Sequence, residues 1–190
     1  ASDVYKRQPP QGDYKNLIFV MELIRLTADY KMKPFDCGDT ELNGFLLDDA
    51  KFYLKQKIAN TFILEEESRV VAYISLLNDK ISKQEVEKAT WRKVKKAFPH
   101  EKHFNSYPAI KIGRFAVSQY YKGQGIGSEL MSYLKDVLLG QNGYSAFRFL
   151  TVDAYLEAIP FYERNDFKML IADEENEHTR TMYFDMMQIP

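Results

Sequence analysis

The feature that most constrains this chain is a strand-like run that leads through a glycine-rich turn into a helix. Residues 110–117 are β-branched, aromatic and apolar, and the run is short enough for a buried strand. From Ile126 onward apolar residues recur every three or four positions, which predicts a helix with one buried face. Residues 119–124 form a polar, glycine-containing turn between them, and further glycines follow at positions 125 and 127. Because the first turn of a helix has unpaired amides and the positive end of its dipole, this order of elements predicts an anion-binding site.

Two familiar phosphate-binding patterns do not fit this turn. The chain contains no GxxxxGK(S/T) run, and Ser128 stands where a dinucleotide fingerprint needs its third glycine. The run Lys122-Gly-Gln-Gly-Ile-Gly127 instead resembles the (Q/R)-x-x-G-x-(G/A) signature of the GNAT acetyltransferases, and the resemblance covers roughly residues 18–188. The chain departs from the signature at Lys122. Since lysine is itself a good phosphate partner, we expect the turn to keep its function.

A second motif supports the same resemblance. Residues 158–167 (AIPFYERNDF) resemble the GNAT segment A-x-x-F-Y-x-x-x-G-F, with Asp166 in place of the glycine. In the family that glycine ends the helix with a left-handed backbone conformation. Aspartate is among the few residues that tolerate this conformation, so we expect Asp166 to keep the turn at the end of the helix. The resemblance implies that Tyr162 is a general acid, which protonates the thiolate that leaves. Alternatively, Tyr162 is one of thirteen tyrosines and only fills the core.

The resemblance also implies how acetyl-CoA binds. The pyrophosphate would lie on the amides of the turn, and the pantetheine would pair with the backbone of a central strand that splays from its neighbour. An amide near Val117 would polarise the thioester carbonyl. Transfer would be direct in a ternary complex, so Cys37 is expected to be a buried apolar residue and not a nucleophile. The expected acetyl-CoA contacts are Phe115, Ala116, Val117, Lys122, Gly123, Gln124, Gly125, Ile126, Gly127 and Ser128.

The acceptor side is less defined by the sequence. In residues 109–117 no carboxylate appears, and only Lys111 and Arg114 are ionisable, so the sequence identifies no general base there. Arg114 is expected either to orient an acceptor phosphate or carboxylate or to form a structural ion pair. His103, and His100 before it, precede this strand and could reach the acceptor through water. The alternative for both is an ordinary exposed histidine in a loop.

Composition and pattern predict one globular domain. Hydrophobic residues make up 45% of the 190, and the formal net charge is −1, which gives no whole-molecule argument for a nucleic acid or a membrane partner. One cysteine and no metal-ligand cluster predict a reducing, cytoplasmic location and no metal. Residues 1–14 are expected to be a disordered or non-native leader before a domain at 15–190, with a basic helical insertion at about 80–107.

The expected fold class is α+β, a single mixed and mostly antiparallel sheet flanked by helices, with splayed central strands as the resemblance implies. About seven strands and four helices are counted. Besides residues 110–117, strands are expected at 17–29, 61–65, 70–77, 146–152, 168–171 and 181–187. Besides the helix from Ile126, helices are expected from residue 41 for about 18 residues, as one helix or two with a break near residues 48–49, and at 83–98 and 156–165.

Residues 35–46, called the opening segment below, resemble one subgroup of the family more specifically. Residues 35–46 (FDCGDTELNGFL) resemble F-x-C-G-x-x-x-L-x-x-(F/W)-L, the opening of a GNAT subgroup that includes toxins acetylating aminoacyl-tRNA. We expect an acetyl-CoA-dependent N-acetyltransferase acting on a small-molecule or peptide amine. The first alternative is acetylation of the amino group of aminoacyl-tRNA, and the second is an inactive CoA-binding regulatory module. Possible partners are tRNA and a second copy of the chain in a homodimer.

Overall fold

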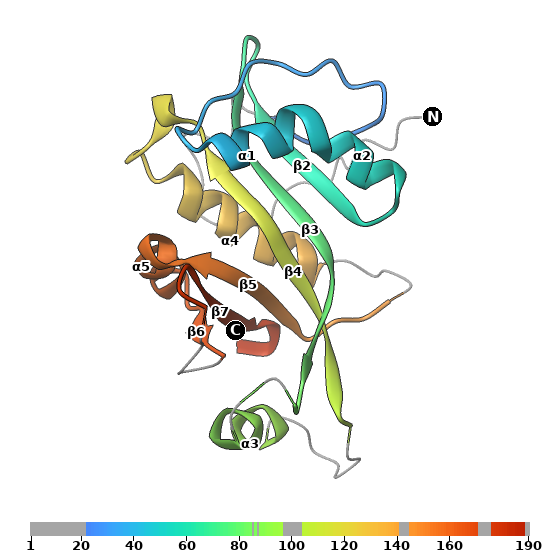
Figure 1. Ribbon diagram of the computed structural model, residues 1–190, viewed down its shortest axis with the longest axis vertical. Coiled ribbons are helices and arrows are strands. Elements are labelled where there is room, and N and C mark those ends of the chain that lie inside the picture. The colour runs from blue at the N-terminus through green and yellow to red at the C-terminus, as the bar shows by residue number, and fades with distance from the viewer. Residues whose placement is uncertain are drawn as a thin grey trace.

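The computed structural model describes residues 22–84, 86, 88–96, 104–140, 145–170 and 176–188, so the expected leader at 1–14 lies outside it. Within these residues seven strands form one sheet in the order β1-β2-β3-β4-β5-β7-β6 (Figure 1). The strands are β1 (Glu22–Arg25), β2 (Ala59–Glu65), β3 (Val70–Ser82), β4 (Ser106–Val117), β5 (Phe149–Tyr155), β6 (Lys168–Met169) and β7 (Thr179–Asp185). The helices are α1 (Thr40–Gly44), α2 (Ala50–Lys55), α3 (Lys88–Lys96), α4 (Ile126–Leu139) and α5 (Ile159–Arg164).

The sheet has one parallel pair. Strands β4 and β5 run parallel, and every other neighbouring pair is antiparallel, which confirms a mixed, mostly antiparallel sheet. Strands β3 and β4 are both longer than the sequence predicted. Their outer ends pair with each other as far as Ser82 opposite Ser106, because the two segments extend together as a ribbon beyond the rest of the sheet. The helix expected at 83–98 is α3, at Lys88–Lys96.

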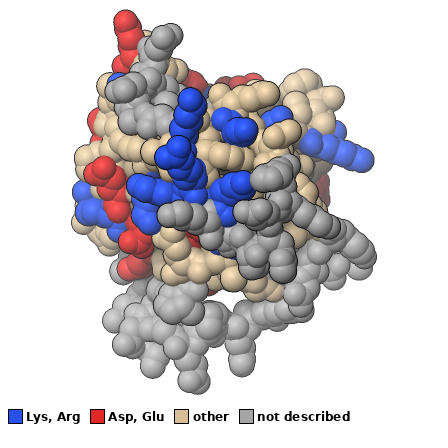
Figure 2. Space-filling model, turned by 90° about the horizontal axis from the view of Figure 1, so that it is seen from below, with Lys and Arg blue, Asp and Glu red and all other residues tan. Residues whose placement is uncertain are grey.

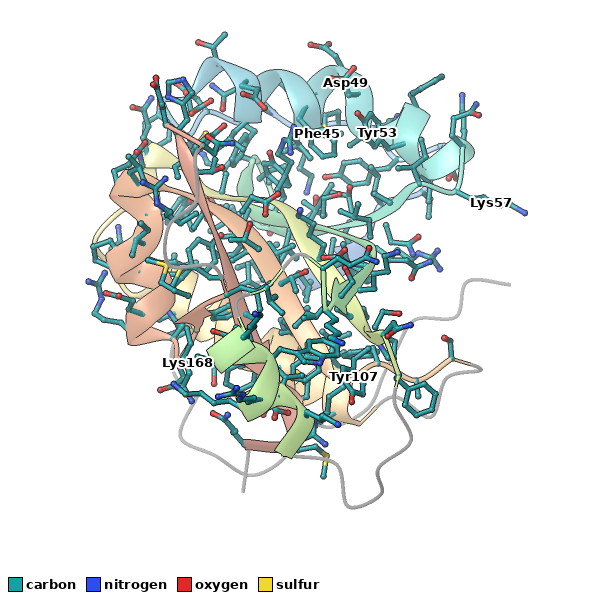
Figure 3. All side chains as sticks on the ribbon, turned by 60° about the horizontal axis from the view of Figure 1, so that its bottom comes forward. Phe45, Asp49, Tyr53, Lys57, Tyr107 and Lys168 are labelled. Atoms are coloured by element: carbon teal, nitrogen blue, oxygen red, sulfur yellow. The ribbon has the colours of Figure 1, made fainter. Side chains whose placement is uncertain are left out.

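The first helical segment covers one face of the sheet. Asp39 caps α1 by accepting a hydrogen bond from the Leu42 amide at 2.9 Å. The segment continues through a π-helical turn (Phe45–Asp49) into α2, where the sequence predicted either one helix or a break. Phe45 and its neighbours pack on the sheet around Tyr73, and Figure 3 shows Phe45 and Tyr53 beneath these helices.

Helix α4 covers the opposite face. Its buried residues Met131 and Leu134 pack against Ile74, Ile112 and Leu150. Successive strand residues point to opposite faces, so Tyr73 lies under α1 while the adjacent Ile74 lies under α4. Figure 1 shows α1 and α2 on one side of the sheet and α4 on the other.

Helix α3 lies on the same face as α1, at the far end of the β3–β4 ribbon. Its buried residues Trp91 and Val94 pack with Ile81, Tyr107 and other strand residues, and the ring centroids of Trp91 and Tyr107 are 5.3 Å apart. Figure 3 shows Tyr107 beside this helix. Ile81 and Tyr73 share a face because they are an even number of residues apart on one strand. No helix in the described residues is long and apolar enough to cross a membrane.

Candidate active site

Strands β4 and β5 pair over only four residues and then separate. Their pairing runs from Ala109 opposite Phe149 to Ile112 opposite Val152. Beyond that point β4 continues beside β3 and β5 continues beside β7. The opening between residues 113–117 of β4 and residues 153–155 of β5 is called the strand gap below. It confirms the expected splay of the central strands.

A β-bulge at Gly113 lies where the gap begins. Ser75 of β3 is opposite Arg114 and Leu76 is opposite Ile112, which leaves Gly113 as the extra residue. A Cβ atom at Gly113 would lie 2.5 Å from Leu77 Cδ2, so only glycine fits without movement. Because the bulge adds one residue, it reverses which side chains face each side. Arg114 therefore lies on the α1 face, and Phe115 packs on the α4 face.

The backbone of β4 presents free groups to the strand gap. The Ser118 amide donates to the Val71 carbonyl at 2.8 Å, which identifies that pair as hydrogen-bonded. Hydrogen-bonded and non-bonded pairs alternate along an antiparallel ladder, so Ala116 pairs with β3 whereas Phe115 and Val117 direct their N–H and C=O groups away from it. Phe115 and Val117 thus have backbone groups available at the gap, and Ala116 does not.

The glycine-rich turn follows directly and leaves its amides open. Gly123 and Gly125 have φ angles of +77° and +83°, in the left-handed region that favours glycine. No acceptor within the described part of the chain receives the amides of residues 123–127. The Ser128 amide, in contrast, donates to the Gly125 carbonyl at 3.0 Å. The turn is mostly exposed, and Gly125 caps α4 without a side-chain partner, so these amides can bind an anion.

The opening segment is bonded to this turn. The Asp36 carboxylate accepts hydrogen bonds from the Gln119 side chain at 2.5 Å and from the Gly38 amide at 2.8 Å. These bonds give partners to polar groups that would otherwise be left unpaired where the two segments meet. The Gly38 bond is the largest cause of a lowered pKa for the Asp36 carboxyl. Lys122 donates to the Cys37 carbonyl at 2.7 Å, so its ammonium is turned toward this segment. Contact with a phosphate on the turn would require Lys122 to rotate away from Cys37.

Tyr162 lies on α5, on the α4 side of the sheet. Phe161 stacks on Phe115 with ring centroids 5.5 Å apart, and Tyr162 packs edge-on against Phe161 and Phe167. Tyr162 is only 6% exposed, and burial raises the pKa of its hydroxyl, so the hydroxyl stays protonated near neutral pH. Among the described residues, the polar side-chain atoms enclosed without a partner are Arg69 Nε and Arg114 Nε. The Tyr162 oxygen therefore keeps contact with solvent although it has no hydrogen-bond partner there.

The end of α5 is fixed to α4. Asp166 has a φ of +66°, which confirms that aspartate takes the left-handed position expected of a glycine. The buried Lys135 ammonium donates to the Asn165 carbonyl at 2.5 Å and lies 3.8 Å from the Phe184 ring centroid. These contacts attach the helix that begins at the glycine turn to the helix that carries Tyr162.

On the opposite, α1 face, an ion pair spans the strand gap. Arg114 Nη2 lies 3.0 Å from Glu41 Oε1, and the Tyr155 hydroxyl donates to Glu41 Oε2 at 3.2 Å. Arg114 therefore forms an ion pair, as one of its two expected roles requires, and its guanidinium also lies 5.5 Å from the Phe45 ring centroid. Neither Glu41 nor Tyr155 is part of a sequence motif that predicts a site residue. Their contacts join residues 73 and 114 positions apart, which no local pattern reveals.

The remaining groups expected near the acceptor are the two histidines and the basic helix. His103 and His100 lie outside the described residues. Helix α3 presents exposed Lys88, Arg92 and Lys93, and no acidic residue occurs within it. A cavity of about 400 Å³ lies between α3 and strands β6 and β7, with Lys93 and Lys168 in its wall. In the described residues, no group of three or more His, Cys, Asp or Glu side chains is placed to hold a metal ion.

Comparison with known families gives one broad match. The model of the acetyltransferase (GNAT) family matches residues 22–167, a range that contains the strand gap, the glycine turn and Tyr162.

Solved structures with the same fold include bacterial toxins. AtaT in complex with acetyl-methionyl-tRNAfMet superimposes with a TM-score of 0.73 and 24% identity over 89% of this chain and 96% of AtaT. A tyrosine-to-phenylalanine mutant of KacT superimposes with a TM-score of 0.73 and 22% sequence identity, over 89% of this chain and 96% of KacT. AtaTR bound with acetyl-CoA superimposes with a TM-score of 0.66 and 23% sequence identity, over 90% of this chain and 96% of the AtaTR chain. At these identities the matches show a shared fold.

Proposed function

Because this chain belongs to the acetyltransferase (GNAT) family, we propose that it transfers the acetyl group of acetyl-CoA to the α-amino group of an aminoacyl-tRNA. The sequence alone favoured a small-molecule or peptide amine and kept aminoacyl-tRNA as an alternative. The fold shared with AtaT, which was solved with acetyl-methionyl-tRNAfMet, supports that alternative.

The donor half of the proposal rests on the strand gap and the glycine turn. The open amides of residues 123–127 suit a pyrophosphate, and the free backbone groups of Phe115 and Val117 suit an amide-containing chain laid along the gap. Acetyl-CoA would supply the thioester, and the Val117 amide, which is directed into the gap, would polarise its carbonyl. Tyr162 then donates its proton to the sulfur as the C–S bond breaks. Phe161 packs against both Phe115 and the glycine turn, which keeps these parts together.

The acceptor half rests on one observation: the basic helix α3 and the strand gap share a face of the sheet. Along β4 the seven residue-to-residue steps from Tyr107 to Arg114 span about 23 Å at 3.3 Å per step. A polyanion that contacts Lys88, Arg92 or Lys93 could therefore reach the gap with its end. Figure 2 views the molecule from the α3 end and shows Lys and Arg side chains gathered near the middle of that surface. The net charge of −1 does not oppose this, because the basic groups are concentrated locally.

Exchange of the proposed acid tests the donor half. In Tyr162→Phe we expect kcat to fall about 100- to 1,000-fold with the dissociation constant of acetyl-CoA unchanged, because only proton donation is removed. Titration calorimetry and single-turnover transfer measure the two quantities. An inactive regulatory module would show no transfer in either protein, and a Tyr162 that only fills the core would leave kcat unaltered.

Charge reversal on α3 tests the tRNA acceptor. Changing Lys88 and Lys93 to Glu should weaken tRNA binding and reduce the slope of log K against log salt by about 0.9 for each lost phosphate contact. The matched control reverses Lys55 and Lys57, which are exposed near the end of α2. Equal losses in both variants, or acetylation of a polyamine and peptide pool in preference to charged tRNA, would contradict this acceptor.

A further inference from the structure

Glu41 is held over the strand gap by one side chain from each diverging strand. Arg114 comes from β4 and Tyr155 from β5, and they bind different oxygens of the same carboxylate at 3.0 and 3.2 Å. The two strands no longer pair with each other at these positions. Glu41 is therefore located at the opening of the gap on the α1 face, although it lies on a helix and not on the sheet.

The Glu41 carboxylate is also accessible. Its side chain is 62% exposed, compared with 39% for Arg114. Asp153, on the same face, is less exposed at 40%; it is ion-paired with Lys111 and accepts a hydrogen bond from Thr181. Asp79 is half-buried and accepts a hydrogen bond from Thr151. Glu41 has remaining acceptor capacity at the gap, since a carboxylate can accept about four hydrogen bonds and two are in use.

The charges around Glu41 favour a cation. Arg114 and Tyr155 contact the carboxylate, and Asp39 acts on Tyr155 electrostatically together with Glu41. Further along the same segment Asp36 interacts with Lys122, and on the sheet Lys111 is paired with Asp153. These two pairs are each neutral, so Glu41 and Asp39 against Arg114 leave an excess of one negative charge beside the gap. Tyr155 stays neutral, because burial raises the pKa of its hydroxyl. A positively charged acceptor would therefore be attracted to this position.

We propose that Glu41 binds the ammonium form of the acceptor amine, so that the acceptor enters the strand gap from the α1 face. This assignment rests on the proposed acetyl transfer. Tyr162 belongs to the core cluster on the α4 side of the sheet, so the amine and the proton donor flank the gap from opposite faces. That arrangement suits direct transfer, since the nitrogen reaches the carbonyl carbon from the side away from the acid.

The protons balance in this arrangement. The bound ammonium loses one proton to water at the exposed carboxylate, and the nitrogen loses its second proton as the C–N bond forms. The C–S bond breaks, and the sulfur takes the Tyr162 hydroxyl proton, which the second nitrogen proton replaces. The products are the acetylated amine, free CoA and one proton in solution.

The test compares Glu41→Gln with wild type in binding and in transfer. The probes are a total tRNA pool charged with amino acids and the same pool after deacylation, bound to the CoA-loaded protein in a filter assay. Wild type should prefer the charged pool, whereas Glu41→Gln should bind both pools alike. The KM for charged tRNA should rise about tenfold, as expected for loss of a hydrogen bond to a charged group, with acetyl-CoA affinity unchanged.

A pH series separates ammonium binding from a structural role. The advantage of wild type over Glu41→Gln should shrink above about pH 8, where an α-amine is neutral. The control Glu67→Gln removes the same charge from the exposed β2–β3 turn and should leave the preference intact. An equal preference in Glu41→Gln and wild type, or a KM difference that does not change with pH, overturns the proposal.

The experiment also distinguishes a wrong tRNA proposal from a wrong assignment of Glu41. If neither tRNA pool is bound or acetylated, the tRNA proposal is wrong, and the same two proteins are compared on a pool of polyamines and peptides. A raised KM for Glu41→Gln on that pool still supports Glu41 as the ammonium-binding residue, and an unchanged KM overturns it.

Discussion

Replacing Gly125 by alanine isolates the conformational requirement of the glycine turn. The residue has φ +83° and ψ −10°, and the atom nearest to an added Cβ is Glu129 Oε1 at 4.0 Å, so no steric clash arises. The cost is conformational: a left-handed non-glycine residue loses about 1–2 kcal/mol. The stiffer unfolded chain offsets about 0.4–1 kcal/mol of this loss. We therefore expect Gly125→Ala to lower the free energy of unfolding by about 1 kcal/mol.

Gly44 provides a chemically identical control. It lies at φ −59° and ψ −43°, in helical conformation, and an added Cβ has no neighbour within 4 Å. Alanine is preferred over glycine inside a helix by about 0.5–1 kcal/mol, so Gly44→Ala should stabilise the protein. Urea unfolding followed by circular dichroism measures both variants, and the two shifts should have opposite signs.

The same pair of variants links the turn to its proposed ligand. If the amides of residues 123–127 hold a pyrophosphate, relaxation of the turn in Gly125→Ala should reduce acetyl-CoA affinity about tenfold, whereas Gly44→Ala should leave it unchanged. Calorimetric titration gives both constants. The reasoning is refuted if Gly125→Ala is as stable as wild type, or if it is destabilised but binds acetyl-CoA with unaltered affinity.

Three further predictions follow from buried groups. Gly113→Ala should destabilise the protein by about 1–3 kcal/mol, because its Cβ would lie 2.5 Å from Leu77 Cδ2; Leu77→Ala should relieve part of this loss in a double-mutant cycle. Burial lowers the pKa of Lys135 in the folded state, so the unfolded chain binds more protons and stability should rise with pH up to about 10.4; Lys135→Met should lack this rise in urea titrations at several pH values. Burial raises the pKa of the Cys37 thiol, which donates to Asn43, so Cys37 should react slowly with a thiol reagent until the protein unfolds, and Cys37→Ala should keep its acetyl transfer.

Local patterns predicted much of the fold and part of the candidate site. The strand, glycine turn and helix around residue 125 were evident because positive φ, helical periodicity and strand-forming residues are properties of neighbours in sequence. The same holds for Asp166 in the left-handed conformation, because its turn is fixed by contacts within four residues. These features identified the proposed donor side of the site before any packing was known.

Tertiary structure decided the acceptor face. The bulge at Gly113 turns Arg114 toward α1, and only the folded sheet brings Glu41 and Tyr155 to that arginine. The lengths of β3 and β4 and the position of α3 on the same face likewise depend on pairing between distant segments. Such contacts depend on how the whole chain packs, since strand register and the facing of side chains are set by partners far away in sequence.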